Sequence, residues 1–379
     1  MTPIFIGSEI YRGSSYGAWH PLHIPRVSTV MDLSRALGWL PPSQYRTSPR
    51  AKPRALTLFH TPDYIAALQQ AEATQRVDDD TRARHGLGST ANPVFPEMYR
   101  RPATGAGGVM LAAELVRDGG IVHVPGGGTH HAMASYANGF CYLNDPVLCL
   151  LSLRQLGLAR IAYVDIDAHH CDGVEAALTG ASDMLMISVH EERRWPFTGA
   201  LDDDGGGRAL NLPVRCGLND TEMRTILQRL ILPALERFDP DAIVLQCGSD
   251  AIEEDPLSRL SLSNNAHAEV AVALTALAPR LIVLGGGGYN PWSVARCWTR
   301  VWGALNGWAV QGALPEAAQH VLEGLRWNRR AAGRNPPEAW RTTLNDPKHE
   351  GPVRTEVTDR IDHLRRRWLR ARPLREAAS

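Results

Sequence analysis

The stretch Ile161–Gly173 reads IAYVDIDAHHCDG, an apolar run that ends in a cluster of acidic and imidazole side chains. Its apolar part, Ile161–Ile166, is a strand candidate, because nearly continuous apolar runs rich in Ile, Val and Leu are typical of central strands that are buried on both faces of a parallel sheet. Four further runs of this kind are separated by segments with helical patterns: Ile121–Val124, Met184–Val189, Ala242–Leu245 and Leu281–Leu284. This alternation predicts an α/β fold, with a parallel sheet covered by helices.

Capping residues mark where several helices are expected to begin. Asn144 and Asn290 can each cap a helix, and a proline follows each of them within two positions. The expected helices are Thr104–Val116, a segment from Asn144 to near Gly157, a segment from Asp220 to about Phe238 with a kink at Pro233, Asn264–Leu277, and Trp292–Asn306.

Two polar segments lie outside these elements. The stretch Arg76–Pro96 contains three consecutive aspartates, Asp78 to Asp80, and is expected to form a long loop. The basic run Arg365–Arg367 near the C-terminus is expected to be a solvated helix face or a frayed tail.

Composition narrows the class of protein. The chain has 379 residues, of which 44% are apolar and 21% are charged, as in an ordinary folded protein. The 40 basic and 40 acidic side chains balance, which argues against direct binding to nucleic acid. No apolar run approaches the ~18–20 residues of a membrane helix, and the first residues lack a secretory pattern. Six cysteines without a CxxC pair indicate a reducing compartment, so the cytoplasm is expected.

Polar residues follow four of the five predicted strands. Ligands of an open parallel sheet bind at the carboxyl ends of its strands, so these segments are expected to meet in one crevice. The segments are Pro125–Ala132, Asp165–Gly173, Gln246–Asp250 and Gly285–Asn290.

The first candidate site is a metal centre. Asp165, Asp167 and His169 alternate along the chain, so they share one face if the strand continues. Two carboxylates and an imidazole on one face repel and lose hydration unless a cation binds. Asp250 adds a ligand, and Asp167, His169 and Asp250 form a set that suits catalytic zinc, although iron or manganese also accept such ligands. The alternative is structural aspartates that accept backbone amides or cap a turn.

The second candidate is a set of acid–base groups. The tandem His130-His131 follows three glycines, which let the backbone leave strand geometry so that both rings can reach the crevice. Asp165 and Asp172 are candidate partners that fix the imidazole tautomers. Tyr289 follows four glycines and is expected to donate its hydroxyl to an oxyanion opposite the metal. The alternative for each residue is a structural role in packing.

These strings, in their order along the chain, resemble the zinc-dependent histone deacetylase family of the arginase/deacetylase superfamily. The loop Gly86–Met98 and the C-terminal extension are most similar to the bacterial acetoin-utilisation branch, AcuC. The strings that carry the family resemblance are GGGTHHA (Gly126–Ala132), GFCYLND (Gly139–Asp145), YVDIDAHHCDGVE (Tyr163–Glu175), QCGSDAIEEDP (Gln246–Pro256) and LGGGGYN (Leu284–Asn290).

The resemblance implies a single domain over residues 1–379 with an arginase/deacetylase-like fold around an eight-stranded parallel sheet. Its core is expected over about 10–305, with a helical extension over about 306–379. The resemblance assigns one zinc ion to Asp167, His169 and Asp250. It also implies a potassium ion near Asp165, Asp167, His169 and Ser188.

The resemblance also assigns roles to the other candidates. His131 is the general base and acid and pairs with Asp172. His130 pairs with Asp165 and stabilises charge, and Tyr289 polarises the acyl carbonyl.

A narrow substrate channel is also implied. Gly139, Phe140 and Trp195 are expected to line it around the methylenes of the substrate lysine. Arg26 matches an arginine near the acetate exit.

The implied activity is zinc-dependent removal of acetyl or other acyl groups from lysine side chains of proteins or peptides, with release of acetate. An alternative is deacetylation of a small amine such as an acetylpolyamine, for which Glu191-Glu192 or the aspartates 78–80 would supply acidity. Two further alternatives are a two-manganese ureohydrolase and a non-enzymatic acyl-lysine binder, and Tyr289 counts against both. No membrane partner is expected, and assembly into an oligomer is left open.

Three positions depart from the family pattern. Cys171 stands where the family usually has glycine, so a positive φ there would be strained. A packed small side chain is the expected role of Cys171. Phe197 replaces a smaller residue at the channel rim, and Ala91 stands where an acidic residue often anchors the substrate backbone.

Overall fold

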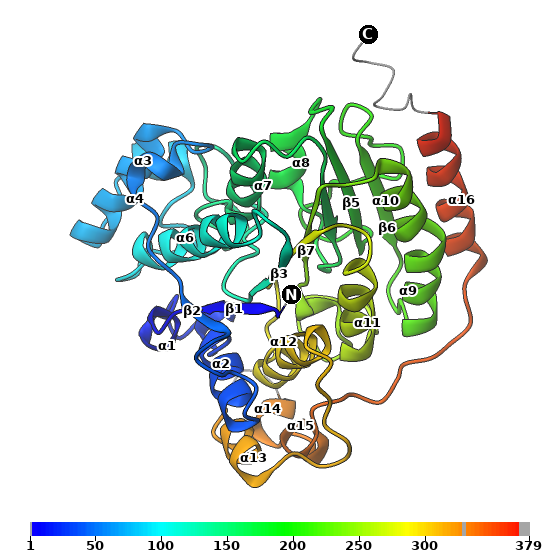
Figure 1. Cartoon of the computed structure of the whole chain (residues 1–379). Helices are drawn as coiled ribbons and strands as arrows, with labels where there is room; N and C mark the ends of the chain where they lie inside the picture. Colours follow the sequence, from blue (N-terminus) through cyan, green and yellow to red (C-terminus); the bar gives the residue numbers. More distant parts are fainter. Residues whose placement is uncertain (1, 328–330, 371–379) are drawn as a thin grey trace.

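Eight parallel strands form one sheet, in the order β2-β1-β3-β8-β7-β4-β5-β6 (Figure 1). The structure is a computed structural model, and it describes residues 2–327 and 331–370. The strands are β1 (Ile4–Gly7), β2 (Tyr45–Thr47), β3 (Gly120–Val124), β4 (Ile161–Asp165), β5 (Met184–Glu191), β6 (Ala209–Val214), β7 (Ala242–Gln246) and β8 (Arg280–Leu284).

Helices occupy most of the connections between the strands and the C-terminal segment, whereas β5 and β6 are joined by a loop. The α-helices are α1 (Ile10–Gly13), α2 (Val27–Ala36), α3 (Pro53–Leu56), α4 (Pro62–Thr74), α5 (Asp79–His85), α6 (Arg100–Leu115), α7 (Asp145–Gln155), α8 (Asp172–Leu178), α9 (Asp220–Ile226), α10 (Leu232–Phe238), α11 (Asn264–Leu274), α12 (Pro291–Leu305), α13 (Glu316–Glu323), α14 (Ala331–Arg334), α15 (Glu338–Thr342) and α16 (Thr355–Arg370). Shorter turns are η1 (Pro21–His23), η2 (Leu227–Ile231, a π-helical turn) and η3 (Ser249–Ala251).

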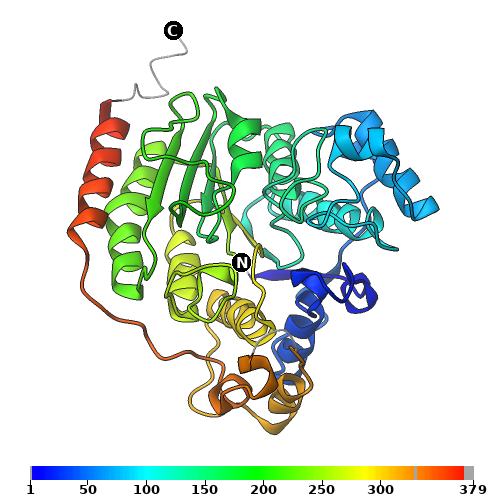
Figure 2. The ribbon, with the colours of Figure 1, turned by 180° about the vertical axis from the view of Figure 1, so that it is seen from behind.

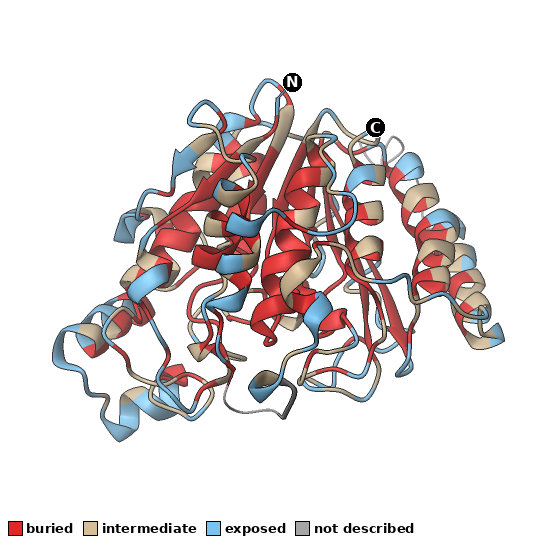
Figure 3. Ribbon diagram, turned by 90° about the horizontal axis from the view of Figure 1, so that it is seen from below, coloured by how far each residue is buried: buried red, intermediate tan, exposed pale blue. Residues whose placement is uncertain are grey.

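Helices cover both faces of the sheet (Figures 1 and 2). Alternate residues of each strand point to opposite faces. Val164 therefore belongs to the buried cluster that includes residues of α9, α10, α11, α12 and α16, whereas Tyr163 belongs to the cluster with α6, α7 and α8. Figure 3 shows that the central strands are buried between these layers. Burial on both faces explains why these strands are apolar throughout rather than alternating.

The five strands predicted from apolar runs are confirmed, with their ends shifted by at most two residues. β1, β2 and β6 were not predicted from the pattern, because β1 and β2 are very short and β6 contains Asn211 and Pro213. The eight-stranded parallel sheet that the resemblance implied is confirmed.

The predicted helices are present, with differences of detail. α6 begins at Arg100, four residues before the predicted start at Thr104. The cap of α9 is Asn219, which accepts a hydrogen bond from the Glu222 amide, rather than Asp220. The deformation expected at Pro233 is the π-helical turn η2, which lies directly before α10. Proline has no N–H for the carbonyl four residues earlier, at Arg229, which lies inside that turn. α11 ends at Leu274 rather than Leu277.

The loop prediction for Arg76–Pro96 was partly wrong, because residues Asp79–His85 form α5. The Asp78 carboxylate accepts a hydrogen bond from the Thr81 amide at 2.7 Å and caps this helix. The aspartates therefore have a local structural role at a helix start, where carboxylates also face the positive end of the helix dipole.

The basic run Arg365–Arg367 lies within α16 and is not frayed there. The Arg367 guanidinium donates hydrogen bonds to the carbonyl oxygens of Leu201 and Ala209, both at 2.9 Å. α16 thus packs against β6 at the edge of the sheet. Residues 371–379 of the expected C-terminal extension lie outside the described residues.

Candidate active site

The carboxyl ends of four adjacent strands bring the candidate residues together. β3, β8, β7 and β4 are neighbours in the sheet, and the polar segments predicted from the sequence follow these strands. Backbones approach closely here, since a Cβ at Gly287 would lie 2.0 Å from the Asp250 Oδ2. The Gly287 amide instead donates a hydrogen bond of 2.6 Å to Asp167 Oδ2. The glycines after β8 therefore let the chain pass over the acidic cluster.

Asp167, His169 and Asp250 form a buried cluster in which the potential ligand atoms all lie within 4.8 Å of one another. The His169 Nδ1 lies 2.8 Å from Asp250 Oδ2 and 3.3 Å from Asp167 Oδ1. No arginine or lysine side chain makes an ion pair with either aspartate among the described residues. Two buried carboxylates with this little compensation fit a divalent cation.

The electrostatics of His169 reflect the same excess of negative charge. Burial lowers the pKa of His169, but Asp167 and Asp250 outweigh it and raise the pKa to about 10. Burial and the charge of Asp167 raise the pKa of Asp250. The three residues thus fit a metal such as zinc, which prefers nitrogen and oxygen ligands of this number and leaves a position open for substrate.

Two histidine–aspartate pairs lie beside this cluster. The His130 Nδ1–H donates to Asp165 Oδ2 at 2.8 Å, and the His131 Nδ1–H donates to Asp172 Oδ1 at 2.7 Å. The two rings lie 4.0 Å apart between their centroids. Because each Nδ1 faces a carboxylate, the other ring nitrogen, Nε2, is left to face the site.

The two histidines differ in their electrostatics although they are adjacent in the sequence. Burial lowers the pKa of His130, but Asp165 and Asp167 outweigh it and raise the pKa to about 9. Burial and the positive charge of His130 lower the pKa of His131 to about 4. His131 is therefore neutral at pH 7 and able to accept a proton, whereas His130 is cationic.

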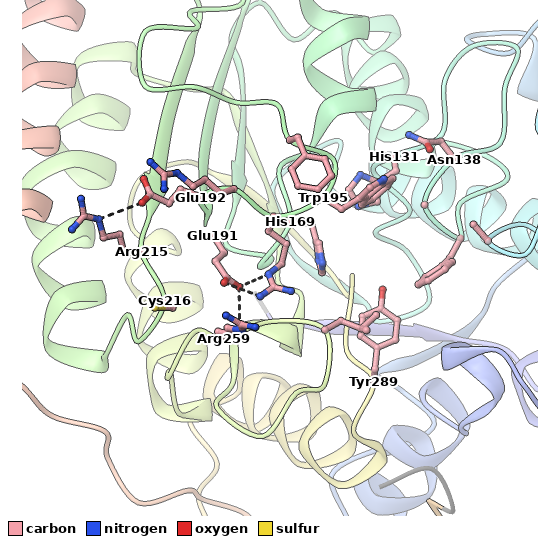
Figure 4. Close-up of a pocket in the computed structure, with 17 residues that line it drawn as sticks. His131, Asn138, His169, Glu191, Glu192, Trp195, Arg215, Cys216, Arg259 and Tyr289 are labelled. Carbon is pink, nitrogen blue, oxygen red and sulfur yellow. Dashed lines mark hydrogen bonds and ion pairs between the residues drawn. The ribbon is translucent and has the colours of Figure 1, made fainter.

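Tyr289 lies on the opposite side of the pocket from His131 (Figure 4). Its amide donates a hydrogen bond of 2.7 Å to Asp255 Oδ2, which fixes the backbone after the glycines. Burial and the charges of Asp250 and Asp167 raise the pKa of the Tyr289 hydroxyl. The hydroxyl therefore keeps its proton and can donate a hydrogen bond.

A pocket of about 960 Å³ leads to this centre. Trp195 stacks edge-on against His131, with 4.5 Å between the ring centroids, and Phe140 faces Tyr289 in the same way at 5.9 Å. Gly139 has φ +53, and a Cβ there would lie 2.2 Å from the Trp195 ring. A side chain at position 139 would therefore collide with Trp195 inside the pocket.

A second, small cavity of about 50 Å³ lies at the inner end of the site and is lined by Arg26, Arg101 and Tyr11 among others. Arg26 donates a hydrogen bond of 2.7 Å to the Gly286 carbonyl, and its Nε has no partner among the described residues. Arg26 therefore lines the small inner cavity and not the outer pocket. This place is compatible with the acetate exit that the resemblance implies for Arg26. Ser188, expected near potassium, pairs with Asp165 across the sheet.

The departures from the family pattern have local explanations. Cys171 has φ −82°, so the strain that a positive φ would cause at this position does not arise. Its side chain is buried, with Sγ 3.6 Å from the Met186 sulfur, as the expected packing role requires. Phe197 is 73% exposed, and both Phe197 and Ala91 line the outer pocket.

Sequence reasoning missed several residues at the site. Asn138 donates a hydrogen bond of 3.1 Å to Asp172 Oδ2, and Tyr163 donates one of 2.7 Å to Asp165 Oδ2. The outer pocket is also lined by arginines that were not singled out: Arg193, Arg194, Arg215 and Arg259. The pair Arg193-Arg194 could have been found from the sequence, because it directly precedes Trp195, which was predicted to line the channel.

Comparisons with known proteins identify relatives of the chain. A profile of the histone deacetylase domain matches residues 20–305. A Caenorhabditis elegans relative named as a histone deacetylase is 34% identical over 313 residues, which cover 79% of this chain and 61% of the relative, less than two thirds of its length. The acetoin utilization protein AcuC of Bacillus subtilis is 32% identical over 318 residues, which cover 80% of this chain and 82% of AcuC.

A solved structure is also similar. The crystal structure of an HDAC homolog from Aquifex aeolicus superposes with a TM-score of 0.88 at 34% identity, over 96% of this chain and 100% of that one. Within residues 2–327 and 331–370, none of the helices combines the length and apolarity that a membrane crossing needs.

Proposed function

The chain belongs to the histone deacetylase family, and on that premise we propose that it removes acetyl groups from lysine side chains of proteins or peptides and releases acetate. The observation that carries this proposal is the buried cluster of Asp167, His169 and Asp250. The cluster lies at the inner end of a pocket that His131 and Tyr289 also line.

The three residues of the cluster would hold one zinc ion. When bound, zinc supplies a Lewis acid and lowers the pKa of a coordinated water toward ~7. We also propose, from the family, a potassium ion near Asp165, Asp167, His169 and Ser188.

His131 acts as the general base and then as the general acid. Its Nε2 accepts a proton from the attacking water, because its Nδ1 donates to Asp172 and fixes the tautomer. The protonated ring then donates to the leaving amine nitrogen. His130 is held by Asp165 and contributes positive charge beside the developing negative charge.

Tyr289 and the channel complete the assignment. The Tyr289 hydroxyl donates to the oxygen of the acyl carbonyl, where negative charge develops. Phe140, Trp195 and Gly139 line the pocket, and in our proposal they surround the four methylenes of the substrate lysine and exclude water from the reacting bond. Arg26 lies at the inner cavity, where acetate would leave.

We further propose that residues 1–379 act as one catalytic domain in the cytoplasm. The C-terminal helix α16 supports a single domain, since it packs on β6 and reaches the pocket wall. The Arg360 guanidinium in α16 donates a hydrogen bond of 2.7 Å to Glu192, a pocket residue.

The test is acetate release by the zinc-loaded protein from an acetyl-lysine peptide and from an acetylpolyamine, measured side by side. We expect turnover of the peptide, and loss of that turnover in the Asp250→Asn variant. Turnover of the acetylpolyamine alone would keep the chemistry and overturn the substrate class. Absence of turnover with either, in protein shown to contain zinc, would overturn the proposed function.

A further inference from the structure

Arginines dominate one side of the outer pocket. Arg193 and Arg194 follow β5, Arg215 follows β6, and Arg259 lies between η3 and α11. Figure 4 shows Arg215 and Arg259 on the side of the pocket away from Asn138. Arg193, Arg194 and Arg215 follow β5 and β6, which are neighbours at one end of the sheet. The segment of Arg259 follows β7 and η3 and joins this wall through its amide, which donates a hydrogen bond to Glu191.

The two glutamates of the same wall are already engaged. Glu191 is buried, lies 2.6 Å from the Arg194 guanidinium, and accepts a hydrogen bond of 2.8 Å from the Arg259 amide. Glu192 accepts hydrogen bonds from Arg360 at 2.7 Å and from Arg215 at 3.3 Å. Four arginines face two carboxylates, so the wall carries an excess of positive charge.

Arg193 and Arg259 carry that excess. Both are exposed, and neither guanidinium forms a hydrogen bond or a close ion pair with the residues that the structure describes. The charge of Arg193 acts on Glu192 only at longer range, where it helps Arg360 and Arg215 to lower the pKa of this carboxyl against the effect of burial. Arg193 has φ +55, a conformation that non-glycine residues adopt rarely and that is enriched at binding sites. The backbone at Arg193, which lines the outer pocket, is therefore in the left-handed conformation.

A guanidinium without a partner suits a carboxylate, because its planar set of N–H donors matches two carboxylate oxygens. From this geometry we infer that the enzyme prefers an acyl-lysine substrate with a carboxylate close to the reacting side chain. The inference rests on the proposed function, since an acyl-lysine in the channel places its backbone and neighbouring groups at this wall. A polycation such as an acetylpolyamine would meet like charge there.

The experiment compares three acetyl-lysine peptides of equal length, with acidic, neutral or basic residues beside the acetyl-lysine. Free acetyl-lysine and its carboxamide are added to distinguish an α-carboxylate from an acidic side chain as the source of the anion. The variants are Arg193→Gln/Arg259→Gln and, as a matched control, Arg54→Gln, which changes an exposed arginine of α3 outside the pocket. Thermal melting establishes that each variant is folded.

We expect kcat/KM for the acidic peptide to exceed that for the basic peptide by about tenfold at low salt, the ratio that corresponds to ~1.4 kcal/mol. The ratio should fall as salt screens the charges. It should fall toward one in the double variant and stay high in Arg54→Gln. The kcat/KM for free acetyl-lysine should exceed that for its carboxamide only if an α-carboxylate reaches the arginines of the pocket wall.

Equal turnover of the three peptides would overturn this inference and leave the proposed function intact. Failure to turn over any peptide would contradict the proposed function instead. In that case, fluorescence anisotropy of the same labelled peptides still measures the charge preference, and equal affinities would overturn the inference.

Discussion

The two ends of strand β7 each carry an aspartate, and the two carboxylates have different surroundings. At the amino end, Asp241 accepts hydrogen bonds from the amides of Ala159 and Arg160 and lies 3.5 Å from the Arg160 guanidinium. At the carboxyl end, the buried Asp250 accepts from the Ala168 amide and faces His169, with another carboxylate nearby. The first carboxylate is satisfied by backbone amides and an arginine, whereas the second lies in a cluster that could hold a metal ion. An aspartate at a strand end thus indicates a metal site only where backbone amides and basic side chains do not already satisfy its carboxylate.

The largest effect is expected from Asp250→Asn, which tests this difference directly. Removal of one ligand charge should release most of the zinc and reduce turnover by several orders of magnitude. Zinc content by elemental analysis and acetate release measure the two effects. If the variant keeps both, the two ends of β7 do not differ as we describe.

The second largest effect is expected from Tyr289→Phe, which changes the site at the carboxyl ends of the strands but leaves Asp167, His169 and Asp250 intact. The loss of one donor to the oxyanion should lower kcat by about 10²–10³ while zinc content stays the same. Binding of a labelled acetyl-lysine peptide serves as the control and should change little. An unchanged kcat would remove Tyr289 from the reaction.

Asp172→Asn should have a smaller effect, about 10- to 100-fold on kcat, because it removes the carboxylate that orients His131 but leaves the ring in place. Single-turnover kinetics with the zinc-loaded variant separate this loss from metal loss. A matched variant, Asn138→Ala, removes only the hydrogen bond to Asp172 and should cost less. Equal effects of the two would show that His131 does not depend on the charge of Asp172.

The smallest effect is expected at the amino end. Asp241→Ala removes the acceptor of two partly exposed amides and should lower the free energy of unfolding by about 1 kcal/mol. Its kcat should equal that of the unchanged protein. Denaturant unfolding and acetate release test the two statements, and a lower kcat in folded protein would break the contrast between the two ends.

The central sheet and the convergence of its polar strand ends could be predicted from the sequence, because apolar runs buried on two faces leave a strong pattern. β4 and β7 are examples, in which every residue is buried. Edge strands leave a weaker pattern, which is why β6 with Asn211 and Pro213 was missed. The backbone conformation of Cys171 could not be predicted from the sequence either. Only the structure shows that Cys171 precedes α8 as its N-cap and has a negative φ.

The pairing of charges was the least predictable part of the site. From the sequence, Glu191 and Glu192 were candidates to bind a cationic substrate. In the structure, arginines from α16 and from the segments after β5 and β6 bind them instead. Arg360 lies 168 residues from its partner Glu192, so no local pattern connects them. Long-range ion pairs decide whether a charged residue is available to a ligand, and they depend on the packed fold.

The packing of α16 on β6 has a consequence for how the protein behaves at high concentration. An open sheet edge offers its backbone groups to a second chain, which is a common start of aggregation. Here Pro213 lacks one N–H donor, and Arg360 and Arg367 occupy the carbonyls of Pro213 and Ala209. A version of the protein cut before Thr355 should therefore lose solubility even if its catalytic residues remain folded.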